Sequence, residues 1–117
     1  MLGVGIAIGN MFPVHNNSFI SDQKVFEQAQ VVSAAINMAL EKELSGARYG
    51  WSNLQAGSKG GVTPLKTWKN QDNQYCREFK LELTLSGKKS LITATACRES
   101  AGYWKPHPPI NRLLLST

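Results

Sequence analysis

The sequence has few of the residues from which most catalytic sites are built. Its 117 residues include only two histidines and two cysteines. His15 and His107 lie near the two ends of the chain, away from its apolar segments. The sequence contains no phosphate-binding loop, HExxH helix or dinucleotide fingerprint. We therefore expect no enzymatic activity and no cofactor, because no nucleophile is paired with a base and no acid–base pair stands out.

A metal site is disfavoured for a related reason. Cys76, Cys97 and His107 would supply three ligands at irregular spacing, whereas zinc sites are typically built from close pairs of ligands. We expect no bound metal.

Long hydrophobic runs are absent as well. No apolar stretch approaches the ~20 residues that a transmembrane helix needs. The first residues, MLGVGIAIGNMF, are apolar but short, and they lack both a basic segment and a clear cleavage site, so they make a poor signal peptide. We interpret residues 1–20 as a glycine-rich leader or linker, because Pro13 and the Asn-Asn-Ser cluster after it break regular structure.

The remaining composition is that of one globular domain. Hydrophobic residues make up 42% of the chain, and the formal charge is +5. This excess favours solubility, or alternatively contact with anionic lipid headgroups or acidic glycans. We expect no nucleic-acid partner, and the sequence leaves the oligomeric state open.

A helix is predicted over residues 21–44. Its apolar residues recur at steps of three and four and would lie on one side. Ser21 is the expected N-cap and Gly46 the residue that ends the helix. The stripe comprises Val25, Ala29, Val32, Ile36, Ala39, Leu40 and Leu44.

Residues 47–105 are predicted to form β-structure. A first strand covers 61–70, with Pro64 at an edge or a strand start. Two longer strands cover 74–85 and 89–99, and a short one begins at Tyr103. The fold class we predict is α+β, with one N-terminal amphipathic helix packed on an antiparallel β-meander of about four strands in residues 21–106. A small β-barrel is the alternative, and residues 107–117 are predicted to form an extended tail.

The two cysteines lie on either side of the predicted hairpin turn. A two-residue turn at Ser86-Gly87 places Cys76 directly opposite Cys97. A turn at Gly87-Lys88 would make the cysteines diagonal neighbours on the same face. Both registers bring the cysteines close, so we predict a Cys76–Cys97 disulfide and an oxidising compartment.

The candidate binding residues are basic or aromatic: Arg77, Arg98, Trp68, Lys69, Trp104 and Lys105. A Trp beside a cation could hold an anionic glycan or peptide. We favour the alternative that the tryptophans fill the core and the two arginines cover them, in which case Arg→Met would cost little stability. The arginines could instead serve a partner or pair with buried carboxylates.

One ordered set of residues spans half of the chain: Trp51, Asn53, Gly57, Gly60, Val62, Pro64, Tyr75 to Phe79, Gly87, Ala96 to Arg98, Gly102 and Trp104. This set resembles the C-terminal domain of the rickettsial 17-kilodalton surface antigen family, in which the Trp-x-Asn segment forms a turn. The resemblance implies a bacterial cell-envelope protein with no established enzymatic activity. Family members often carry a lipoprotein signal and a glycine-zipper segment before this domain. In this sequence, GVGIAIGN is at most a remnant of the zipper.

The function we expect is therefore that of a non-enzymatic, surface antigen-like structural protein of a Gram-negative envelope, in the periplasm or at the outer-membrane surface. The alternative is a periplasmic module that binds an anionic glycan such as peptidoglycan, lipopolysaccharide, or a secretion-system protein.

Overall fold

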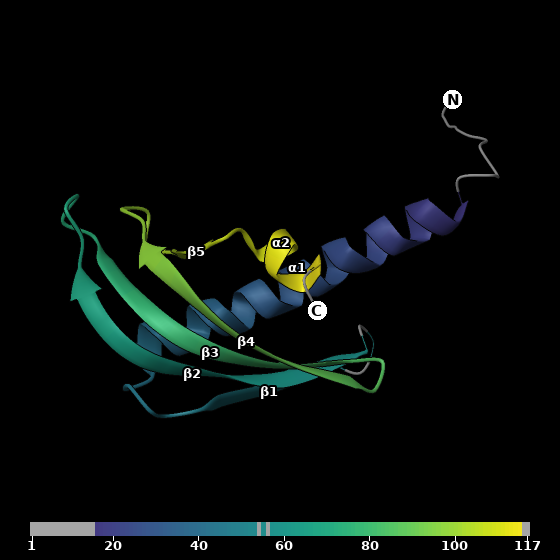
Figure 1. Cartoon of the computed structure of the whole chain (residues 1–117), viewed down its shortest axis with the longest axis horizontal. Helices are drawn as coiled ribbons and strands as arrows, with labels where there is room; N and C mark the ends of the chain where they lie inside the picture. The colour runs from purple at the N-terminus through teal and green to yellow at the C-terminus, as the bar shows by residue number, and fades with distance from the viewer. Residues whose placement is uncertain (1–15, 54, 56, 116–117) are drawn as a thin grey trace.

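One long helix lies across an open antiparallel sheet in the computed structural model, which describes residues 16–53, 55 and 57–115 (Figure 1). The strands follow one another in the sheet in chain order, β1-β2-β3-β4-β5. The predicted α+β fold is confirmed, with five strands rather than about four. The barrel alternative is wrong, because β1 and β5 do not pair. The elements are α1 (Asn16–Lys42), β1 (Tyr49–Asn53), β2 (Ser58–Lys69), β3 (Tyr75–Leu85), β4 (Lys88–Arg98), β5 (Trp104–His107) and α2 (Ile110–Leu115).

Helix α1 packs on the sheet through the predicted apolar stripe. Val32, Ile36 and Ala39 are fully buried, and Leu40 nearly so. Leu44 is 81% exposed because the helix ends before it, at Lys42. The prediction for Leu44 is therefore wrong.

Both ends of α1 differ from the prediction. The helix begins at Asn16, so Ser21 lies inside it and is not the N-cap. Gly46 does adopt a left-handed conformation, with φ of 90°, but in the turn that follows the helix. Residues 1–15 of the predicted leader lie outside the described residues.

The core lies between α1 and one face of the sheet, which we call the inner face. Alternate side chains of β3 supply its centre, and Phe79, Leu81 and Leu83 are at most 1% exposed. Val62 of β2 and Ala96 of β4 flank them and are fully buried. Because side chains alternate along a strand, the residues between these ones lie on the opposite, outer face, away from α1.

Residues 107–115 of the predicted extended tail instead form the end of a strand and a packed helix. His107 ends β5, and residues 110–115 form α2. Leu113 and Leu114 are 4% and 6% exposed and belong to the core. The prolines that suggested an extended tail stand before the helix, where proline is well tolerated. The carbonyl of Pro109 accepts hydrogen bonds from the Arg112 and Leu113 amides.

Pro64 lies at a free edge, as predicted. Strand β1 pairs only with residues 58–62 of β2, so Pro64 and the residues after it have β3 as their single strand neighbour. The Pro64 carbonyl accepts a hydrogen bond from the Gly46 amide in the connection after α1. A β-bulge follows between Pro64 and Lys66. Proline, a bulge and a lysine are features that protect an exposed strand edge from pairing with other chains.

Candidate functional site

The β3–β4 hairpin has the register of a two-residue turn. Leu85 pairs with Lys88, and Ser86 and Gly87 adopt left-handed φ angles of 51° and 82°. Cys76 therefore faces Cys97, and the two form a disulfide. The predicted bond is confirmed, whereas the diagonal register is wrong.

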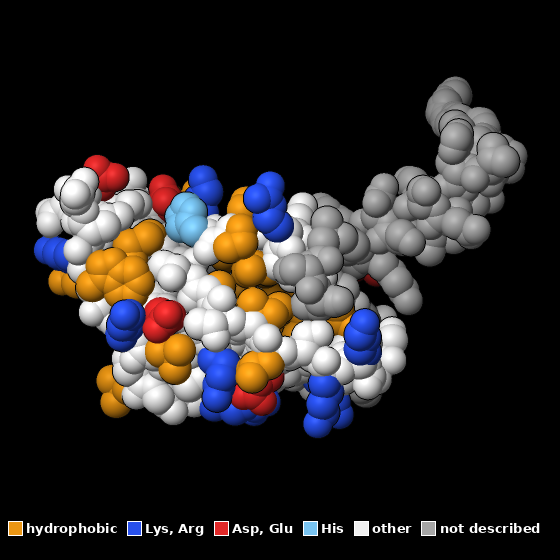
Figure 2. Space-filling model, in the orientation of Figure 1, with side chains coloured by type: hydrophobic (Ala, Val, Ile, Leu, Met, Phe, Trp, Pro, Cys, Tyr) orange, Lys and Arg blue, Asp and Glu red, His pale blue; other side chains and the backbone are white. Residues whose placement is uncertain are grey.

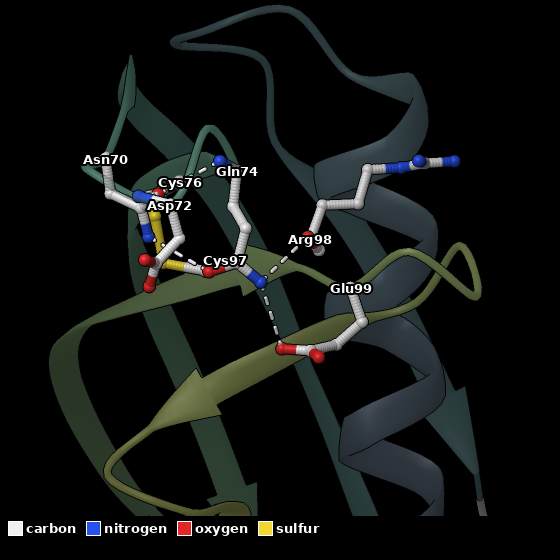
Figure 3. Close-up of a disulfide and its surroundings, with 7 residues drawn as sticks. All are labelled: Asn70, Asp72, Gln74, Cys76, Cys97, Arg98 and Glu99. Carbon is white, nitrogen blue, oxygen red and sulfur yellow. Dashed lines mark hydrogen bonds between the residues drawn. A yellow bond between two sulfur atoms is a disulfide. The ribbon is translucent and has the colours of Figure 1, made fainter.

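The disulfide lies at the end of the sheet opposite the Ser86-Gly87 turn, beside a turn held by side chains (Figure 3). The Asn70 side-chain oxygen accepts hydrogen bonds from the Asp72 and Gln74 amides, both at 2.9 Å. The Gln74 side-chain amide donates to the Arg98 carbonyl and the Glu99 carboxylate. The β2–β3 turn is thereby tied to the end of β4, beside the disulfide, and both cysteines are buried.

Arg77 holds the C-terminal end of α1. Its guanidinium is buried and donates to the carbonyls of Leu40 at 2.7 Å and Glu43 at 2.9 Å. It also donates to the hydroxyls of Thr67 and Ser45. The carbonyls of a helix end carry partial negative charge and lack partners within the helix, so a cation is favourable there. The expectation that Arg77 covers aromatic rings is wrong.

Arg98 belongs to a second link between α1 and the sheet. Its Nε lies 2.9 Å from a carboxylate oxygen of Glu41, and the same carboxylate accepts a hydrogen bond from the Trp104 indole. The Asn37 side chain binds both the amide and the carbonyl of Trp104. These contacts fix β5 against α1, so Trp104, which is buried, is not available to a ligand.

The electrostatic effects of these contacts follow from their geometry. The hydrogen bond from Arg98 lowers the pKa of Glu41, with a further lowering from the Trp104 indole. The same pair raises the pKa of Arg98. Burial lowers the pKa of Arg77, whose partners are neutral oxygens.

The six predicted binding residues do not form one site. Arg77, Arg98 and Trp104 connect the sheet to α1. Trp68 and Lys105 lie on the outer face, one on each side of the disulfide in the cross-strand row Trp68–Cys76–Cys97–Lys105. Lys69 shares the inner face with Tyr75 and lies over its ring, with 5.0 Å from the ammonium to the ring centroid.

A groove at the opposite end of the outer face was not anticipated. Four side chains from four strands form one cross-strand row there: Ser52, Lys59, Thr84 and Lys89. Two hollows, of about 780 and 410 Å³, are both lined by all four residues. We call these four residues the hydroxyl–lysine row.

Two adjacent glycines make room beside this row. Arg48 crosses the outer surface of Gly61 to reach Glu82, with 3.1 Å between the guanidinium Nε and the carboxylate. A Cβ at Gly61 would collide with the Arg48 side chain. On the inner side, a Cβ at Gly60 would collide with the Glu82 carbonyl oxygen and approach the Trp51 ring. The Arg48–Glu82 pair thus forms one wall of the groove.

Sequence reasoning missed the groove because it missed β1. Tyr49–Asn53 was assigned to no predicted strand, and the Trp51–Asn53 segment was expected to form a turn. These residues are strand, and the chain turns after them. Tyr49 and Trp51, alternating with Gly50 and Ser52, are the signal that could have identified this strand.

Other kinds of site find no support in the described part of the chain. No helix there is long and apolar enough to span a membrane. Those residues also contain no group of three or more His, Cys, Asp or Glu side chains that could hold a metal ion.

The fold and its outer face define a small disulfide-linked α+β domain with a polar groove. A family model described as "17 kDa outer membrane surface antigen" matches residues 38–105, from the last turn of α1 into β5, and the chain belongs to this family. The resemblance drawn from the sequence is therefore confirmed.

Curated relatives show the same relationship. The 17 kDa surface antigen of Rickettsia bellii is 42% identical over 67 residues, which are 57% of this chain and 42% of the relative. The 17 kDa surface antigens of Rickettsia conorii and Rickettsia rickettsii are 40% identical over the same length and shares. The chain thus spans less than half the length of these relatives. No solved structure matches the chain.

Proposed function

We propose that this protein is a non-enzymatic structural component of a Gram-negative cell envelope, located in the periplasm or at the outer-membrane surface. The Cys76–Cys97 disulfide is the observation that carries the proposal. The bond joins two neighbouring strands and is 1% and 9% exposed at its two cysteines. Structural disulfides of this kind persist in oxidising compartments and are rare in the cytosol. Membership of the surface antigen family supports the same location.

The experiment that tests this proposal reads location and thiol state together. Cells producing the protein from its natural gene are quenched with acid, alkylated with a mass tag and fractionated. We expect the protein in the envelope fraction with no tag added unless a reductant is used first. A Cys76→Ser/Cys97→Ser variant gives the untagged reference. Tagged protein in the cytosolic fraction would contradict the proposal, and protease added to intact cells separates the outer surface from the periplasm.

A second candidate function is a periplasmic binding module for an anionic glycan, lipopolysaccharide or a secretion-system partner. The hydroxyl–lysine row favours it, since it offers cationic and hydroxyl groups in an open groove. Figure 2 shows Lys and Arg side chains at several places on the visible face, including the lower edge, where strands lie in Figure 1. Co-sedimentation with peptidoglycan or lipopolysaccharide at low and high salt tests it, because binding through exposed charges weakens as salt rises.

A further inference from the structure

The hydroxyl–lysine row is built by strand pairing rather than by flexible loops. Ser52 pairs with Lys59, Lys59 with Thr84, and Thr84 with Lys89, so the four side chains alternate hydroxyl and ammonium across the sheet. Neighbouring strands are ~4.8 Å apart, which places the two lysine backbones about 10 Å apart with Thr84 between them. Two long, flexible ammonium side chains on either side of a hydroxyl can converge on one anion above that hydroxyl.

The row also has positive charge that the protein does not neutralise. Within the described part of the chain, neither Lys59 nor Lys89 forms an ion pair. Both are exposed, and the nearest carboxylate in the groove, Glu82, is already bound by Arg48. An anion in the groove would therefore meet two uncompensated ammonium groups.

We propose that the hydroxyl–lysine row binds a phosphate group carried on an envelope saccharide. This inference rests on the second candidate function above and names the ligand class and the site. Lysine binds phosphate as a point charge with three N–H donors, and it does not need the planar fork that an arginine offers to phosphate or carboxylate. The arginine of this groove, Arg48, is engaged with Glu82. The free donors are ammonium and hydroxyl groups, which suit the oxygens of a phosphate.

The shape of the groove favours a saccharide over a flat lipid surface. The hollows on the two sides of the row, about 780 and 410 Å³, are in the range of small-molecule sites, ~300–1,000 Å³. Leu91, 67% exposed, lines the larger hollow and offers an apolar contact to the face of a sugar ring. A phosphate bound by the row could thus carry a sugar ring in the neighbouring hollow.

The test uses the full chain and a core oligosaccharide released from lipopolysaccharide by deacylation, which keeps its phosphates but has no acyl chains. Binding is measured by isothermal titration with this oligosaccharide and with the same material after chemical dephosphorylation. We expect the dephosphorylated form to bind at least tenfold more weakly. The Lys59→Gln/Lys89→Gln variant should lose about tenfold or more, as expected for two charge-assisted hydrogen bonds. Thr84→Val, which keeps every charge, should lose severalfold.

A matched control comes from the same face of the sheet. Lys66→Gln/Lys105→Gln removes the same charge from exposed positions at the disulfide end, and it should change affinity less than twofold. Melting curves confirm that each variant folds. The proposal is overturned if the control pair loses as much affinity as the groove pair, or if the dephosphorylated oligosaccharide binds equally well. It is also overturned if phosphatidylglycerol vesicles bind more tightly than the oligosaccharide.

The proposed envelope location can fail independently. Fractionation and thiol state decide the location without any ligand, whereas the titration uses purified protein. If the protein is found in the envelope but does not bind the phosphorylated oligosaccharide, only the ligand inference is overturned.

Discussion

Replacing Arg77 by Met tests whether the buried guanidinium holds α1 on the sheet. Met fills much of the space of the arginine stem, so the change removes mainly the polar contacts. Those contacts are four hydrogen bonds, two of them to the carbonyls of Leu40 and Glu43 at the end of α1. No water can easily replace the donor at a residue that is 8% exposed.

The expected loss of stability is large. Each buried carbonyl left without a donor costs about 1–3 kcal/mol. Loss of a cation at a helix C-terminus adds about 0.3–1 kcal/mol. We therefore expect Arg77→Met to lower the free energy of unfolding by about 3–5 kcal/mol, a large share of the ~5–15 kcal/mol that a domain typically has.

Urea denaturation followed by circular dichroism measures this loss. With a slope of about 2 kcal/mol per molar urea, the midpoint should fall by roughly 1.5–2.5 M. Arg98→Met is the control, because its partner Glu41 is largely exposed and exposed ion pairs contribute little. If Arg77→Met stays within about 0.5 kcal/mol of the wild type, or if the two variants lose the same amount, Arg77 does not hold the helix end.

Three further predictions concern other links in the fold. Replacing both cysteines by Ala should lower the free energy of unfolding by about 3 kcal/mol, measured by urea denaturation, since the bond closes a loop with a sequence separation of 21; an unchanged midpoint would contradict this. Ile36→Asp should unfold the domain because it buries an unpaired charge, whereas Gln30→Asp on the exposed side should melt like the wild type; equal melting temperatures would mean that α1 does not dock. Because the pKa of Glu41 is lowered in the folded state, its stabilisation is present above the ordinary carboxyl pKa and is lost as pH falls through the lowered value. The stability difference between wild type and Glu41→Gln should therefore shrink in acid, and a difference that grows there would refute the assignment.

The hairpin was predictable from the sequence because two constraints agree there. Alternation of apolar residues in 75–85 indicates the faces, and either turn, Ser86-Gly87 or Gly87-Lys88, brings Cys76 and Cys97 close together on one face. The structure then selects the direct Cys76–Cys97 register. The buried stripe of α1 was predictable because its apolar residues recur at steps of three and four. Helix α2 was not predictable from the sequence, because the prolines before it suggest an extended chain. In the structure these prolines precede α2 and its buried leucines.

The candidate site was less accessible to sequence reasoning. Alternation places Arg77 on the inner face but says nothing about which backbone atoms end a helix there. The hydroxyl–lysine row depends on the register of three strand pairs, including the one between β1 and β2. A five-residue strand with glycine and serine on one face carries too weak an apolar pattern to set that register.

Gly60 and Gly61 are neighbours in β2, but their missing side chains would lie on opposite faces of the sheet. The inner side of Gly60 faces the Trp51 ring and the Glu82 carbonyl. The Arg48 side chain lies across the outer side of Gly61, beside the groove. A side chain at the first position would act on the folded core, whereas one at the second would reshape the outer wall. A substitution at Gly61 can therefore alter the outer surface while leaving the inner contacts of Gly60 in place, and the reverse holds for Gly60, because the strand backbone separates the two faces.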